Sequence, residues 1–143
     1  MANATEHVSI PVLGKMGVEV LEVTPTRVRA KMPLAGNHNH VGTMYAGCLF
    51  TLAEFPAGIL FVNRVDTKKI APLVADMKIR FRRPATTDIT VDFVMAEEDL
   101  QRLHEQTMAE GKASLHSTQQ LTDEHGEVVA ITEARYVWLK LGD

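Results

Sequence analysis

One carboxylate stands alone in the longest apolar stretch of the chain. Glu54 is the only side chain between Tyr45 and Asn63 that is ionised at neutral pH by its ordinary pKa. Burying an unpaired carboxylate costs several kcal/mol, a large share of the ~5 to 15 kcal/mol that stabilises a domain. Such a group in a partly dry pocket can act as a general base or a nucleophile. The other interpretation is an ion pair with Arg80 or Arg135, or a wet strip of a helix.

Small residues precede this carboxylate, in the segment Gly42-Thr43-Met44-Tyr45-Ala46-Gly47. If a helix begins here, the backbone N–H groups of its first turn lack intrahelical acceptors. Together with the helix dipole, they can hold a developing oxyanion. The glycines can equally form a turn and a close helix contact, which is the commoner use of glycine.

Hydropathy patterning predicts the elements that position these groups. An apolar pattern on every side predicts a buried helix from Tyr45 to about Val62. Alternation predicts strands over Met16–Val23, Arg27–Met32, Leu73–Phe81, Asp88–Glu97, Ala113–Thr122 and Val128–Leu139, with a charged stretch around residues 97–111. In the third of these strands, Leu73, Ala75, Met77, Ile79 and Phe81 are expected on one face. A curved antiparallel sheet must wrap the apolar helix, so we expect an α+β fold with a long central helix.

Composition excludes several classes of protein. The 143 residues, 45% of them hydrophobic, suit a single domain over 1–143. A formal charge of -3 provides no net positive field for nucleic acid or an anionic membrane. Glu54, Pro56 and the glycines argue against a membrane span in the apolar segment. The single cysteine, Cys48, cannot close an intrachain disulfide, and Met1 to Ile10 lack the features of a secretory signal, so we expect a cytoplasmic location.

Two stretches of the chain resemble a known family. Residues 39–54, Asn-His-Val-Gly-Thr-Met-Tyr-Ala-Gly-Cys-Leu-Phe-Thr-Leu-Ala-Glu, resemble the signature of hotdog-fold acyl-CoA thioesterases of the phenylacetate-pathway (PaaI-like) type. That signature has an Asn, a Gly-x-x-His-Gly-Gly turn and an acidic residue at similar spacing. Residues 75–85 are similar to the strand that follows the helix in those enzymes. The resemblance looks closest to the branch that includes the C-terminal domains of YiiD-type proteins.

The resemblance implies a hotdog fold over most of the chain and hydrolysis of an acyl-CoA or related acyl thioester. It implies no metal and no cofactor, with coenzyme A present only as part of the substrate or product. It also implies a homodimer or a homotetramer. Edge strands left open in the predicted sheet independently favour pairing with a second copy.

Catalytic roles follow from the matching positions. The resemblance implies that Glu54 activates water or attacks the thioester, that the Ala46 N–H polarises the carbonyl, and that Asn39 orients carbonyl or water. Tyr45 and Gly47 flank this donor. Ala46 and Glu54 are eight positions apart, or about 12 Å along a helix. Ala46 and Glu54 of one chain cannot both contact the same substrate carbonyl, so a site that uses both must lie between two subunits.

Three positions depart from the family pattern. Tyr45 stands for the usual His, Ala46 for a glycine, and Val74 where many relatives carry a Ser or Thr that helps hold the attacking water. Of these, Ala46 and Val74 favour the alternative function, a module that binds acyl-CoA without cleaving it. A hydratase or dehydratase is disfavoured because no Asp and His pair suited to proton shuttling lies near the helix start.

The remaining candidates concern substrate binding and metals. Arg80, Arg82 and Arg83 can bind the phosphates of coenzyme A, because guanidinium groups are good partners for phosphate. The same three arginines can equally form the solvated face of a strand. The substrate-binding candidates are Val74, Asp76, Phe50, Met77, Arg80, Arg82 and Arg83. His38 and His40 lack the further ligands that a metal site needs. Cys48 is best read as a small buried apolar side chain.

Overall fold

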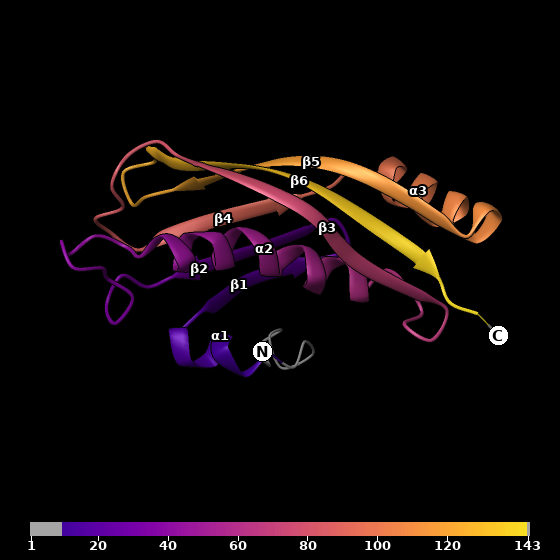
Figure 1. Ribbon diagram of the computed structural model, residues 1–143, viewed down its shortest axis with the longest axis horizontal. Coiled ribbons are helices and arrows are strands. Elements are labelled where there is room, and N and C mark those ends of the chain that lie inside the picture. Colours follow the sequence, from indigo (N-terminus) through magenta and orange to yellow (C-terminus); the bar gives the residue numbers. More distant parts are fainter. Residues whose placement is uncertain (1–9, 143) are drawn as a thin grey trace.

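The computed structural model describes residues 10–142. Its elements are α1 (Pro11–Met16), β1 (Glu19–Thr24), β2 (Arg27–Met32), α2 (Ala46–Val62), β3 (Ile70–Phe81), β4 (Ile89–Val94), α3 (Glu97–Glu110), β5 (Lys112–Thr122) and β6 (Val128–Lys140). The strands form one antiparallel sheet in the order β1-β2-β4-β5-β6-β3. Helix α2 lies along one face of this curved sheet (Figure 1). The expected α+β fold with a wrapped central helix is confirmed.

The core lies between α2 and the inner face of the sheet. Ten of the seventeen residues of α2 are buried, which explains why its sequence is apolar on every side. Phe61 packs edge-on against Trp138 and Tyr136 of β6, with ring centroids 5.3 and 5.1 Å apart. The helix runs continuously through Pro56. Within residues 10–142, no helix has the length and apolar character to cross a membrane.

Strand β3 forms one edge of the sheet and contains a bulge immediately after Val74. Residues directly opposite in an antiparallel pair share a face. Val74 lies opposite Tyr136 and Met77 opposite Ala134, both buried, so Val74 and Met77 face inward. Leu73 lies one position earlier and is 49% exposed. The prediction that Leu73 and Met77 share a face is wrong, because the bulge inserts a residue and shifts the alternation.

The first predicted strand is placed too early in the sequence. Residues Pro11–Met16 form the short helix α1, and β1 starts only at Glu19. Pro11 occupies the first turn, where its missing N–H costs nothing, and Gly17 ends the helix with a φ of 76°. The next strand forms the expected hairpin with β1.

A third helix occupies the charged stretch that separates the later strands. Leu100, Leu103 and Thr107 are buried at helical spacing, whereas most of the other residues of α3 are exposed. The predicted strand over Asp88–Glu97 therefore ends earlier, at Val94, and Glu97 begins the helix. The apolar face of α3 packs on β5 and β6, at the end of the sheet away from the start of α2 (Figure 1).

Candidate functional site

The loop before α2 is held by the side chain of Asn39. Its Oδ1 accepts hydrogen bonds from the N–H groups of Val41 (3.0 Å) and Thr43 (3.1 Å), and its Nδ2 donates to Thr43 Oγ1 (2.8 Å). Gly42 turns the loop with a φ of 87°, a conformation that side chains disfavour. Since Nδ2 carries two hydrogens, Asn39 retains one donor for a substrate.

Helix α2 begins at Ala46 with an uncapped backbone. The preceding residue, Tyr45, makes no side-chain capping hydrogen bond. The Ala46 N–H has no acceptor among residues 10–142, and this residue is exposed. The ring of Tyr45 folds over Gly47, where an added Cβ would lie 2.6 Å from a ring carbon. Glycine at position 47 therefore allows the tyrosine ring to cover the first turn.

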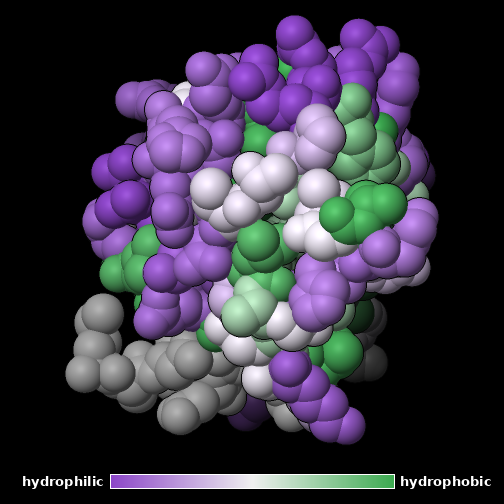
Figure 2. Space-filling model, turned by 90° about the vertical axis from the view of Figure 1, so that its left-hand side faces the viewer, coloured by the Kyte–Doolittle hydropathy of each residue, from purple (hydrophilic) through white to green (hydrophobic). Residues whose placement is uncertain are grey.

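A cavity of about 410 Å³ opens at this helix start. Asn39 and Ala46 line it together with Arg82 and Arg83 from the segment after β3, and Phe81 adds an apolar wall. Figure 2 looks onto this end of the molecule and shows apolar surface between hydrophilic regions. The helix-start cavity thus combines a free backbone donor, an amide and two guanidinium groups.

Glu54 lies in a second, smaller cavity of about 70 Å³ between α2 and β3. No hydrogen bond or ion pair to Glu54 occurs within the described part of the chain. Arg135 donates instead to Asp76, with a distance of 3.1 Å between Nε and Oδ2. Burial raises the pKa of the Glu54 carboxyl above its ordinary value. The alternative interpretation, an ion pair of Glu54 with Arg80 or Arg135, is not found among residues 10–142, and Glu54 is a half-buried carboxylate without a cation.

The two cavities share no residue. Asn39 and Ala46 meet in the helix-start cavity, whereas Glu54 and Val74 meet in the second cavity, which we call the Glu54 cavity. Since α2 is continuous from Ala46 to Val62, the helix separates Ala46 from Glu54 by about 12 Å. One chain therefore carries two incomplete sets of groups.

The other predicted substrate-binding residues are dispersed. Phe50 is 39% exposed on α2, and Met77 is half-buried on the inner face. Asp76 and Arg80 lie on the outer face, where Arg80 lines a shallow cavity with Glu133. The structure thus separates Arg80 from Arg82 and Arg83, because β3 ends at Phe81 and the last two arginines lie beyond the strand, at the helix-start cavity.

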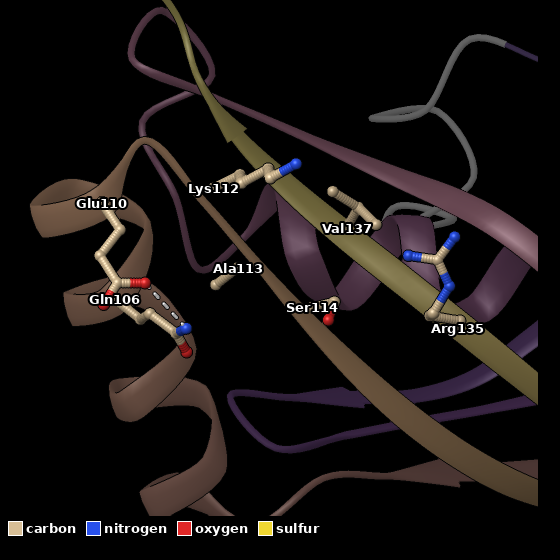
Figure 3. Close-up of a pocket in the computed structure, with 7 residues that line it drawn as sticks. All are labelled: Gln106, Glu110, Lys112, Ala113, Ser114, Arg135 and Val137. Atoms are coloured by element: carbon tan, nitrogen blue, oxygen red, sulfur yellow. Dashed lines mark hydrogen bonds between the residues drawn. The ribbon is translucent and has the colours of Figure 1, made fainter.

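Another cavity, a groove of about 370 Å³, lies on the outer face of the sheet beside α3 (Figure 3). Gln106 and Glu110 of α3 are hydrogen-bonded to each other at its rim (3.1 Å). Ser114, Arg135 and Val137 point into it from β5 and β6, with α2 behind the sheet. This groove contains none of the proposed catalytic residues.

Other reactive side chains are accounted for more simply. Cys48 is 5% exposed, and burial raises the pKa of its thiol, which suits the expected apolar role. His38 and His40 are exposed in the loop. In the described range 10–142, no group of three His, Cys, Asp or Glu side chains is arranged to hold a metal ion.

Sequence reasoning missed Tyr136 as a residue of the Glu54 cavity. Its side chain lines that cavity from β6 and is 1% exposed. Its distance in sequence from Glu54 hides this proximity. The signal that could have found it is the register of β6 against β3, which places Tyr136 opposite Val74.

A central helix laid across a curved six-stranded antiparallel sheet in this order defines a hotdog fold. Residues 4–139 match the family model described as a domain of unknown function, DUF4442, and the chain belongs to that family.

Solved structures of other proteins share this fold. A Pseudomonas aeruginosa protein of unknown function, described as a probable thioesterase, is 41% identical, with a TM-score of 0.92 over 98% of this chain and 94% of its own. A candidate thioesterase from Shewanella oneidensis is 26% identical, with a TM-score of 0.73 over 94% of this chain and 92% of its own. The PaaI protein of Escherichia coli, at 15% identity, shares the fold with a TM-score of 0.68, over 96% of this chain and 89% of its own.

Proposed function

We propose that this protein hydrolyses acyl-CoA or related acyl thioesters at a site shared by two subunits. The observation that carries the proposal is the half-buried carboxylate of Glu54, without a cation, on the same helix as an exposed N-terminal donor. The description of the Pseudomonas aeruginosa relative as a probable thioesterase supports the reaction class.

A homodimer that pairs through β3 accounts for the two incomplete cavities. Strand β3 is an edge strand, and its exposed apolar residues include Leu73, Val74 and Phe81. With Ala75 left out as the extra residue of the bulge, Val74 and Phe81 lie three positions on either side of Lys78, and both face inward. An antiparallel pair of β3 strands centred there would bring the Glu54 cavity of one protomer toward the helix-start cavity of its partner. Two complete sites, or four in a tetramer, would result.

The proposed reaction needs only groups of the chain and a water molecule. Glu54 takes a proton from water, whose oxygen attacks the thioester carbonyl carbon, while the Ala46 N–H of the other protomer holds the oxyanion. The carbon–sulfur bond then breaks, and the thiolate leaves with the proton from Glu54. A raised carboxyl pKa suits this base, because efficiency is greatest when that pKa approaches the working pH. No metal or further cofactor takes part in this scheme.

Substrate binding in the proposal follows the linings of the two cavities. Arg82 and Arg83 stand at the helix-start cavity, where their guanidinium groups can hold the phosphates of coenzyme A. Asn39 contributes its remaining donor to the carbonyl, and Phe81 of the helix-start cavity and Val74 of the Glu54 cavity offer apolar surface to the acyl group. Nucleic acid and membranes have no role, and the proposed site of action is the cytoplasm.

One observation favours a second candidate function, a module that binds acyl-CoA without cleaving it. Val74 places an apolar side chain beside Glu54, where a hydroxyl would help to hold water. In that case the two cavities would bind the thioester, and the intact compound would be recovered.

The test is release of free thiol from short, long and aromatic acyl-CoA thioesters. We expect release by the wild-type protein and a loss of at least about 100-fold in Glu54→Gln, since the amide cannot accept the proton. Glu133→Gln, on the exposed outer face of β6, is the matched control and retains activity.

Two outcomes would contradict the thioesterase proposal. Equal release by the wild-type protein and Glu54→Gln would exclude the carboxylate as the base. No release from any thioester, with acyl-CoA binding seen by calorimetry, would leave the binding module as the function.

A further inference from the structure

Tyr136 lines the Glu54 cavity and carries a buried hydroxyl. Its ring is fixed by edge-on packing against Phe61 (5.1 Å between centroids) and Phe93 (6.0 Å). The side chain is 1% exposed, and its Oη has no hydrogen-bond partner within residues 10–142. Register places it directly opposite Val74, on the inner face of the sheet.

This hydroxyl is unfavourable for stability alone. A buried polar group without a partner destabilises the folded state, and phenylalanine would give the same ring packing without that cost. Most buried hydroxyl groups in folded proteins have a partner. The phenol at position 136 therefore calls for a partner that other described residues do not supply.

The lining of the cavity indicates what that partner is. Of its eight lining residues, only Glu54 and Tyr136 have polar side chains. Its volume of about 70 Å³ exceeds the roughly 10–15 Å³ that one water molecule requires. Burial and the nearby negative charge of Glu54 raise the pKa of Tyr136, so the phenol stays protonated at neutral pH and remains a hydrogen-bond donor.

We propose that Tyr136 is a positioning residue whose hydroxyl donates a hydrogen bond to the water molecule that Glu54 deprotonates. The inference rests on the proposed thioesterase function. The phenol and the carboxylate hold the water between β6 and α2, and the apolar side chain of Val74 closes the third side. The hydroxyl that positions water is thus supplied from β6, one strand further from the edge than Val74.

The first test is the kinetics of Tyr136→Phe, which removes only the hydroxyl. We expect kcat to fall roughly 10- to 100-fold with little change in KM, because the water is misplaced while the substrate still binds. The acid limb of kcat/KM should move to higher pH, since the Glu54 carboxylate loses a water-linked donor. Trp138→Phe is the packing control: this residue also contacts Phe61 but does not line the cavity, so its acid limb should stay in place.

A second test does not depend on activity. The side-chain carboxyl carbon of Glu54 can be followed by ¹³C NMR as pH changes, with its signal assigned by its loss in Glu54→Gln. We expect the Glu54 pKa to be higher in Tyr136→Phe than in the wild-type protein. An unchanged titration together with an unchanged kcat would overturn the inference. If the wild-type protein releases no thiol, the proposed function fails, while the NMR titration still decides whether Tyr136 acts on Glu54.

Discussion

At the scale of single residues, the proposed base Glu54 reduces the stability of the fold. It is the one carboxylate of α2, and burial without a cation disfavours its charged form. Below the pKa of the unfolded chain, the carboxyl is neutral in both states and has no effect. As the pH rises, the unfolded chain ionises first, so the destabilisation by this residue grows until the folded chain is ionised as well, and it stays at its full value above that pH.

Glu54→Gln should therefore raise stability at neutral pH. We expect the melting temperature at pH 7.5 to rise by a few degrees, because the neutral amide avoids the desolvation of the carboxylate. The difference between the two proteins should vanish well below pH 4.5, the ordinary pKa of the group. Thermal unfolding followed by circular dichroism at both pH values measures this. A variant less stable than the wild-type protein at pH 7.5 would contradict the account of Glu54.

The residues of the site were predictable to different degrees. Glu54 stands out in the sequence because a lone charge within an apolar helix is unusual. The loop residue Asn39 was found by family resemblance, yet its bonds within the loop appear only in the structure. Tyr136 could not be found in this way, because an aromatic residue on a strand is usually core and its place beside Glu54 depends on strand register.

At the scale of elements, periodicity predicts regular segments and fails at irregular ones. The helix over residues 46–62 and the inward positions of β4 follow from simple patterns. The bulge in β3 breaks the alternation, and no residue in the sequence marks it. The sequence pattern did not predict helix α3, because only Leu100, Leu103 and Thr107 of its fourteen residues are buried, which leaves a weak apolar stripe.

Helix α3 offers a prediction about stability alone. Its N-cap residue, Ala96, has extended backbone angles and cannot form a side-chain cap. Ala96→Ser should stabilise the protein by about 1 kcal/mol, since the serine hydroxyl can accept from a free N–H of the first turn. Chemical denaturation measures the gain, and thiol release should be unchanged because α3 lies away from both cavities. A loss of stability would show that the start of α3 differs from the structure described above.

At the scale of the whole molecule, the proposed function depends on the separation of the two cavities. Each chain has the helix-start donor at Ala46 and the carboxylate at Glu54, about 12 Å apart along one helix. Residues of β3 line both cavities, and β3 is an edge strand that is open to pairing. The proposed catalysis therefore requires a dimer.

Two variants can remove one half of the site each. Ala46→Pro deletes the N–H at the first helical position, where proline is well tolerated. The preceding Tyr45 has a φ of -59° and a ψ of 137°, which suit a residue before proline. Glu97→Pro deletes the N–H at the first residue of α3, together with the ion pair between Glu97 and Arg64, and is the matched control, with activity retained.

The most direct test of a shared site is activity in mixed dimers of Ala46→Pro and Glu54→Gln. Each variant alone should be inactive. A heterodimer has one site with both defects and one site with neither, so co-expressed and co-purified heterodimers should recover about half of the wild-type thiol release. Heterodimers as inactive as either parent would show that Ala46 and Glu54 act within one chain, or not together, and would contradict the account.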